Sequence, residues 1–146
     1  QFMMYKFRSM HVQTDEEERE QWTTKNDPRK TKWGSFMRKT SIDELPQFID
    51  ILKGDMSVVG PRPERVEHVE QYTAEVPEFS YRLKVKGGLT GYAQIYGKYN
   101  TTAYDKLKLD LMYIQNYSIL LDLKLIIMTG KILFVKESTE GFEEKK

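Results

Sequence analysis

Short runs in which apolar and polar residues alternate predict several β-strands along the chain. The strand candidates are residues 2–10, 56–59, 81–86 and 92–96. The last two are joined by a glycine-rich stretch, residues 87–91, which indicates a bend. The candidates are short, so the pattern predicts a small sheet.

Apolar residues spaced three and four apart predict helices between these strands. Leu45, Phe48, Ile49 and Leu52 form the clearest stripe, and Gly54 follows at a position where helices commonly end. The other helix candidates are residues 14–25, 64–74 and 101–117. Residues 14–25 are polar and acid-rich, which indicates an exposed helix with acids in its first turn.

The helix that ends at Gly54 has two possible starts. Ser41 and Glu44 have the spacing of a capping box, and Asp43 is also a good N-cap residue. Pro46 has no backbone N–H and is tolerated only in the first turn, which favours a start near Asp43. With either start, Asp43 and Glu44 lie at the N-terminal end of a helix.

Residues 118–136 predict a helix that is apolar around most of its circumference. One narrow polar stripe includes Asp122 and Thr129, two lysines lie roughly opposite, and most other positions are large and apolar. Such a helix is either buried between two apolar neighbours or lies partly in a membrane interface, with its lysines reaching water.

Composition restricts the classes of protein that fit this pattern. The 146 residues are enough for one domain, and 39% of them are hydrophobic, which allows a core. The absence of cysteine excludes disulfides and cysteine-bound metals, and a net charge of +1 argues against a nucleic-acid-binding protein. No uncharged apolar run approaches the roughly 18 residues of a membrane span. The start at Gln1, directly before an apolar run, suggests a piece of a longer chain.

Charged residues gather on both sides of the Asp43 region. The segment 29–39 contains several cations and no acid, which indicates either a solvated basic face or a site for phosphate or a lipid headgroup. Asp43 and Glu44 are either ordinary capping residues or a functional pair. In a functional pair, one carboxylate attacks a substrate and the other holds a hard cation such as Mg²⁺.

Arg62 is a second candidate because it lies between Pro61 and Pro63. The two prolines stiffen the loop, and a guanidinium held in one place suits bidentate phosphate recognition, although a rigid turn with an exposed arginine has the same sequence. Lys6 and Arg8 are either site cations or solvated charges on a strand edge. Taken together, the cations and the acid pair indicate diphosphate chemistry with Mg²⁺.

Several segments closely resemble the bacterial sugar transferase family, the monotopic phosphoglycosyl transferases that act on polyprenyl phosphates. The matching segments are KFRSM at 6–10, RKTSIDELPQ at 38–47, LKGDMSVVGPRP at 52–63, LTGYAQ at 89–94, DLMYI at 110–114 and residues 118–122. The resemblance extends over nearly all of residues 1–146, as one catalytic domain.

The resemblance implies transfer of a sugar-1-phosphate from a UDP-sugar to undecaprenyl phosphate in a ping-pong cycle. Asp43 would attack the β-phosphate and carry the phosphosugar as an ester, and Glu44 would bind Mg²⁺. Arg62, flanked by Pro61 and Pro63, would meet the donor phosphate or nucleotide. Three further residues fall on family motif positions and are site candidates: Lys6, Arg38 and Asp110.

The expected fold is a small mixed α+β domain with a short sheet and several helices, some of them amphipathic and flat on a membrane surface. The family's N-terminal re-entrant membrane helix would precede Gln1 and hold the protein at the cytoplasmic face of the bacterial cell membrane. The reaction would be the first membrane step of capsule, exopolysaccharide or glycoconjugate assembly. The alternative is a catalytically silent membrane-surface module of polysaccharide assembly.

Overall fold

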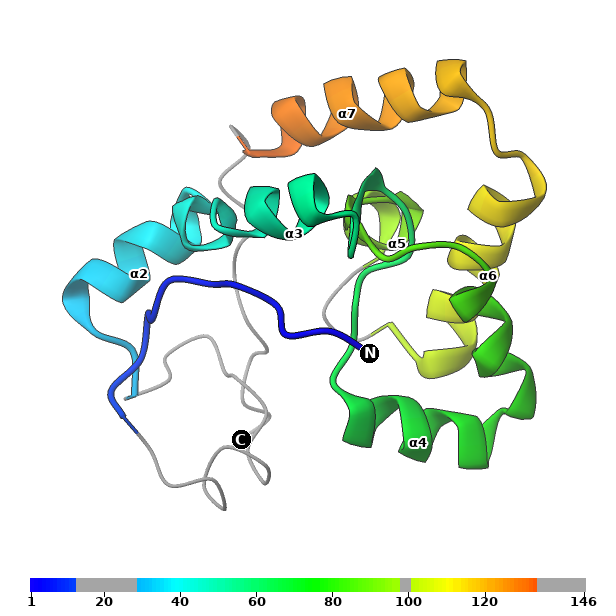
Figure 1. Ribbon diagram of the computed structural model, residues 1–146, viewed down its shortest axis with the longest axis horizontal. Coiled ribbons are helices and arrows are strands. Elements are labelled where there is room, and N and C mark those ends of the chain that lie inside the picture. The colour runs from blue at the N-terminus through cyan, green and yellow to red at the C-terminus, as the bar shows by residue number, and fades with distance from the viewer. Residues whose placement is uncertain (13–28, 98–100, 134–146) are drawn as a thin grey trace.

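Helices make up most of the computed structural model, which describes residues 1–12, 29–97 and 101–133. They surround a sheet of two short strands, which confirms a mixed α+β fold (Figure 1). The elements are α2 (Lys32–Lys39), η1 (Ile42–Glu44), α3 (Gln47–Lys53), β1 (Ser57–Val59), α4 (Val66–Glu75), η2 (Pro77–Lys84), β2 (Gly88–Thr90), α5 (Tyr92–Tyr96), α6 (Ala103–Gln115) and α7 (Ile119–Leu133). Figure 1 shows α7 along one side of the molecule and α4 at the opposite side, with α6 between them.

The two strands β1 and β2 are parallel, and the backbone at Gly60, directly after β1, lies against β2. Val59 is in register with Thr90, and the Gly60 N–H donates to the Thr90 carbonyl over 2.8 Å. A Cβ atom at Gly88 would lie 2.1 Å from the Gly60 nitrogen, so a residue without a side chain is required there. This contact sets the loop that follows β1 directly against β2.

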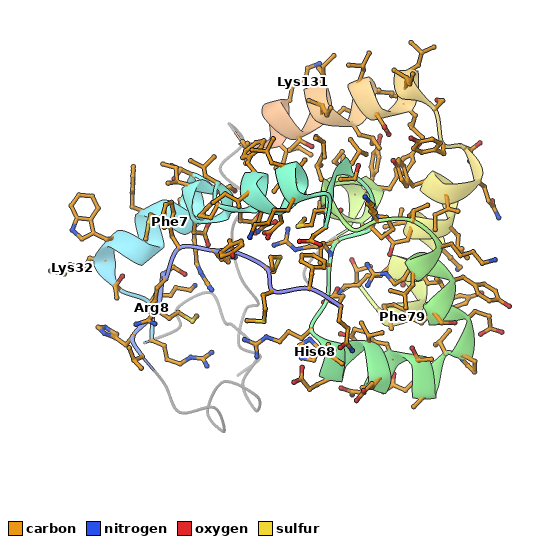
Figure 2. The ribbon with its side chains drawn as sticks, viewed as in Figure 1. Phe7, Arg8, Lys32, His68, Phe79 and Lys131 are labelled. Carbon is orange, nitrogen blue, oxygen red and sulfur yellow. The ribbon has the colours of Figure 1, made fainter. Side chains whose placement is uncertain are left out.

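The buried apolar residues form two centres. Val59, Tyr113 and Leu125 form the first, which joins β1 to α6 and α7. The second is Phe79 in η2, which is fully buried with Tyr72 against it, their ring centroids 5.1 Å apart. Figure 2 shows Phe79 among the side chains at the α4 end of the molecule. The two centres together fix η2 and α6 next to the loop after β1.

Two of the predicted strands are wrong because the alternation has another cause. Residues 81–86 lie mostly in the 3₁₀-helix η2, where Arg82 is buried and its neighbours Tyr81 and Leu83 are exposed. Residues 92–96 form α5, and Tyr92 and Tyr96 stack with centroids 5.5 Å apart, as side chains one helical turn apart do. The stretch predicted as a bend, residues 87–91, contains strand β2 instead.

The prediction of a strand over residues 2–10 is also wrong, because this extended segment bonds to helices and loops. Among the residues that the structure describes, Met10 alone in this segment forms a bridge, to Lys30. The Phe7 N–H donates to the Asp43 carbonyl over 3.0 Å, and the Tyr5 N–H donates to Asp50 Oδ2 over 3.0 Å. The helix predicted at 14–25 lies outside the described residues, while 56–59, 64–74 and 101–117 are confirmed by β1, α4 and α6.

The helix predicted to begin near Asp43 is divided into two pieces. Residues Ile42–Glu44 form the single 3₁₀ turn η1, and α3 begins only after Pro46. Ser41 has φ of 54° and makes no side-chain capping bond, so the capping box predicted from Ser41 and Glu44 is absent from this turn. The predicted end is confirmed, since Gly54 has φ of 82° and closes α3.

Two helices, α3 and α7, bury polar side chains and expose several large apolar ones, although α7 also buries Leu125. In α3, Asp50 is buried while Leu52 is 87% exposed. In α7, Asp122 accepts a hydrogen bond from the Tyr113 hydroxyl over 2.9 Å and Thr129 bonds to Thr90, while Leu120 is 80% exposed. The helix predicted over 118–136 is confirmed over Ile119–Leu133 and is not wholly buried, while residues 134–136 lie outside the described part of the chain. Within the described ranges, no helix has the length and apolar character needed to cross a membrane.

The close approach of the strands predicts opposite effects of alanine at two glycines. Gly88→Ala should lower the free energy of unfolding by about 2 kcal/mol or more, because its Cβ would collide with backbone. Gly130→Ala, in α7 with open space around it, should raise it by roughly 0.5–1 kcal/mol. Urea denaturation of both variants measures the difference, and equal midpoints would contradict the described strand packing.

Candidate active site

The acid pair lies in η1 and is covered by a lysine from the extended N-terminal segment. Asp43 is 2% exposed, and Lys6 Nζ lies 3.2 Å from its Oδ2 atom. The same Nζ atom is 3.4 Å from Glu44 Oε1. The segment is fixed at this point by the bond from the Phe7 N–H to the Asp43 carbonyl. The backbone thus places the lysine over both carboxylates.

Arg62, in the loop that follows β1, also contacts this acid pair. Its two terminal nitrogens both contact the Glu44 carboxylate, one of them over 3.5 Å to Oε2. The Arg62 side chain is 43% exposed, so its guanidinium lies at the surface and not in the core. A planar guanidinium in this position can also contact an incoming phosphate with two parallel hydrogen bonds.

The electrostatics of the site stabilise the charged forms of its groups. Burial alone would raise the pKa of Glu44, but the charges of Arg62 and Lys6 outweigh it and hold the pKa below its ordinary value. The partial loss of hydration around the Arg62 guanidinium would lower its pKa, but the charge of Glu44 outweighs this and raises the pKa. Glu44 is therefore an anion, and Arg62 a cation, at neutral pH.

The loop that carries Arg62 is held at each of its residues. The Pro61 carbonyl accepts from the Gly88 N–H over 2.9 Å, and the Arg62 carbonyl accepts from Arg82 over 2.7 Å. The Pro63 ring lies against Gly87, where an added Cβ would be 2.7 Å from the ring Cγ. Pro61 and Pro63 thus act as supports for Arg62 in this structure.

The remaining predicted site residues lie farther from the acid pair. Arg38, at the end of α2, donates to the Ser9 hydroxyl over 2.9 Å, and within the described part of the chain it has no bond to the acid pair. Asp110 is buried in α6 and pairs with Arg82. Burial raises the pKa of Asp110 to about 6, against the opposing charge of Arg82. Arg8 lies on the extended segment and is exposed (Figure 2).

Sequence reasoning missed two buried charged residues that shape the site. Arg82 lies within the strand predicted over residues 81–86, and Asp50 lies in the helix predicted to end at Gly54, where it is not among the site candidates. A signal for Arg82 was present, because Asp110 falls among the inward residues of an amphipathic helix and a buried carboxylate needs a cation. For Asp50 the signal was weaker, because its partner is the backbone N–H of Tyr5.

Carboxylate oxygens, which the acid pair supplies, are among the ligands that a magnesium ion prefers. Across the described ranges, no group of three or more acidic or histidine side chains is arranged to hold a metal. Asp43 and Glu44 supply adjacent carboxylates, and Mg²⁺ is commonly held by one or two carboxylates together with substrate phosphates and water. Carboxylates of this kind therefore fit a magnesium ion as part of its ligand set.

The charge cluster predicts how Glu44 titrates in buffer without divalent cations. Lys6→Met should raise the Glu44 pKa, and Arg62→Met should raise it by a larger amount. Each substitution removes a charge that stabilises the glutamate anion. Lys53→Met is the matched control, since Lys53 bonds to the Tyr5 hydroxyl instead. Carboxyl NMR chemical shifts measure the three values.

The sign for stability follows from the lowered pKa. The cluster stabilises the fold above the ordinary glutamate pKa, and that contribution is lost as the pH falls through the lowered folded-state value. A Glu44 pKa that stays unchanged in Lys6→Met would show that Lys6 does not pair with this carboxylate in solution.

Comparison with known proteins gives the family of the chain. The family model described as bacterial sugar transferase matches residues 1–136. A UDP-glucose:undecaprenyl-phosphate glucose-1-phosphate transferase of Klebsiella pneumoniae is 48% identical over 140 residues, which cover 92% of this chain and 30% of that protein. The galactosyl transferase CpsE of Streptococcus agalactiae is 43% identical over 145 residues, covering 92% of this chain and 32% of CpsE.

The name of a third relative contains another sugar. The UDP-N-acetylgalactosamine-undecaprenyl-phosphate N-acetylgalactosaminephosphotransferase of Aeromonas hydrophila is 44% identical over 131 residues, covering 88% of this chain and 31% of that protein. The chain thus spans about a third of the length of these curated relatives. The match over nearly its whole length shows that the chain belongs to the bacterial sugar transferase family.

Proposed function

We propose that this chain carries the active site of an enzyme that transfers a sugar-1-phosphate from a UDP-sugar to undecaprenyl phosphate. The observation that supports this most strongly is the meeting of Lys6 and Arg62 over the Asp43–Glu44 pair. Two cations next to two carboxylates offer both a nucleophile and the positive charge that a diphosphate needs. The names of the relatives describe the same kind of reaction.

Asp43 is the proposed nucleophile. One of its carboxylate oxygens forms a bond to the β-phosphorus of the UDP-sugar, and the bond from that phosphorus to the bridging oxygen breaks, so that UMP leaves. The phosphosugar remains on Asp43 as an acyl phosphate ester. A phosphate oxygen of undecaprenyl phosphate then attacks the same phosphorus and releases the Asp43 carboxylate.

Lys6 controls access to this nucleophile in the proposed cycle. Asp43 is nearly inaccessible with Lys6 Nζ 3.2 Å away, while the Lys6 side chain itself is one-third exposed. Lys6 has a flexible stem, so its ammonium can move from the carboxylates to an incoming phosphate. That movement uncovers Asp43 only when an anionic donor is present to replace its partner.

Arg62 and Glu44 prepare the donor phosphates. Arg62 would exchange its contact with Glu44 for the diphosphate, and Glu44 would then be free to hold Mg²⁺ together with donor oxygens. The bound cation would neutralise charge on the diphosphate and so allow an anionic nucleophile to approach. Arg38 fixes the extended segment through Ser9, and so supports Lys6 from a distance.

The outward apolar faces of α3 and α7 are proposed to lie on the lipid surface where the acceptor resides. Phe48 and Leu52 on α3 and Leu120 and Ile127 on α7 are exposed, although their helices bury polar residues. Lys131 points away from α7 at the surface (Figure 2), as a lysine at a lipid interface does. We place this surface at the cytoplasmic face of the bacterial cell membrane.

The proposed role is the first membrane step of capsule, exopolysaccharide or glycoconjugate assembly. Two of the relatives named above, those of Klebsiella pneumoniae and Aeromonas hydrophila, have undecaprenyl phosphate in their names, together with different sugars. A step that loads this lipid precedes every reaction that extends the sugar chain on it. Which UDP-sugar is used is a question for a donor panel.

The nucleophile is tested by UMP release from UDP-sugars in the full-length protein with Mg²⁺ and lipid acceptor. Asp43→Asn should lower the rate by about 10³-fold or more, because the amide cannot form the ester. Asp55→Asn, an exposed acid in the turn after α3, is the matched control and should leave the rate unchanged. Circular dichroism checks that both variants fold.

A second outcome would favour the silent membrane-surface module. In that case the unaltered protein releases no UMP from any UDP-sugar, although it binds membranes. Continued transfer by Asp43→Asn would instead show that the enzyme uses another nucleophile.

The lipid surface is tested by vesicle sedimentation of the chain with phosphatidylethanolamine and phosphatidylglycerol. Replacing Leu120 and Ile127 together by glutamine should weaken binding about tenfold or more, because their apolar area no longer enters the lipid. Leu83→Gln, at an exposed apolar position in η2, is the control and should bind as before. Equal binding of the unaltered protein and both variants would show that α7 does not contact the membrane surface.

A further inference from the structure

Arg82 and Asp110 form a buried ion pair behind the Arg62 loop. Arg82 Nε lies 2.9 Å from Asp110 Oδ2, and the two side chains are only 4% and 2% exposed. Arg82 comes from η2 and Asp110 from α6, so the pair joins two elements. With so little exposed surface, neither side chain is accessible to a substrate.

The rest of the Arg82 guanidinium is directed at the backbone of the loop. Its second terminal nitrogen donates to the Arg62 carbonyl over 2.7 Å, while the Phe79 ring supports the group with its centroid 4.8 Å away. One rigid fork therefore bonds a carboxylate and a carbonyl at the same time. A lysine has a single nitrogen and cannot occupy both positions.

The backbone carbonyl that Arg82 holds belongs to the residue whose side chain contacts Glu44. Pro63 already favours an extended conformation at Arg62, and the Pro61 carbonyl is bonded to Gly88. The bond from Arg82 fixes the orientation of the Arg62 carbonyl itself. A continuous series of contacts thus leads from Asp110 through Arg82 and Arg62 to Glu44.

A purely stabilising role explains this arrangement poorly. A buried ion pair loses the hydration of both charges, and apolar residues of similar volume often stabilise a core as well or better. What apolar residues cannot do is hold the Arg62 carbonyl by a charge-assisted hydrogen bond. The ion pair therefore serves to hold the loop that carries Arg62.

We propose that Arg82 is a positioning residue that holds Arg62 ready for the donor diphosphate, with Asp110 orienting Arg82 and neither residue touching substrate. This inference rests on the proposed function for its effect on catalysis. It assigns Asp110 a role behind the site, in place of the direct substrate contact that its motif position implied.

The test is a double-mutant cycle in the full-length protein with a UDP-sugar donor. Arg82→Lys keeps the charge next to Asp110 and should raise the donor KM about tenfold, with a smaller effect on kcat, because the Arg62 carbonyl is released. In an Arg62→Ala background the same substitution should have no further effect on KM, since Arg82 acts through Arg62. Lys106→Met, which breaks the ion pair of Lys106 with Glu64 nearby, is the control and should leave KM unchanged.

Amide hydrogen exchange tests the same inference without an activity measurement. Arg82→Lys should speed exchange in the peptide that covers residues 60–66 and leave the α7 peptide unchanged. Asp110→Asn, which keeps an oxygen for Arg82, should show the same pattern more weakly and serves if Arg82→Lys does not fold.

The outcomes separate this inference from the proposed function. An unaltered protein without transferase activity would overturn the proposed function, while exchange in residues 60–66 would still test the positioning of the loop. Equal KM changes in the presence and absence of the Arg62 side chain would overturn the positioning role. Unchanged exchange in residues 60–66 would overturn it as well.

Discussion

The pairing of Lys6 and Arg62 with the Asp43–Glu44 carboxylates is the interaction on which the site depends. These charges come from three segments that are distant in sequence: the N-terminal extended segment, η1 and the loop after β1. Partly buried charges are stable only with partners in place, so each segment must be fixed before the others are useful. Backbone bonds at Phe7, Gly88 and Arg62 provide that fixation.

The buried polar side chains of α3 and α7 also help to fix the elements around the site. In α3, Asp50 bonds to the Tyr5 backbone and so holds the residue next to Lys6. In α7, Asp122 and Thr129 bond to Tyr113 and Thr90, which tie the helix to α6 and to β2. Both helices bury polar side chains that tie them to neighbouring elements, while several of their large apolar side chains are exposed. The proposed lipid contact would use these exposed side chains.

Sequence predicted the parts of this structure that local chemistry determines. The stop at Gly54, the helix α6 and the stiffness around Arg62 follow from residues close in the chain. The strand predictions for residues 2–10 and 81–86 are wrong because an alternating pattern alone does not show whether a partner strand exists. Arg82 was missed because its role depends on Asp110 and the Arg62 carbonyl, which are neighbours only in the fold.

The most direct test is a mass measurement on the full-length protein after a short reaction with Mg²⁺ and a panel of UDP-sugars, with no lipid acceptor. Proteolysis and mass spectrometry should find one peptide heavier by a sugar phosphate, with the addition on Asp43, and undecaprenyl phosphate should remove it. An addition on another residue, or UMP formed together with free sugar phosphate and no adduct in any peptide, would contradict a covalent cycle through Asp43.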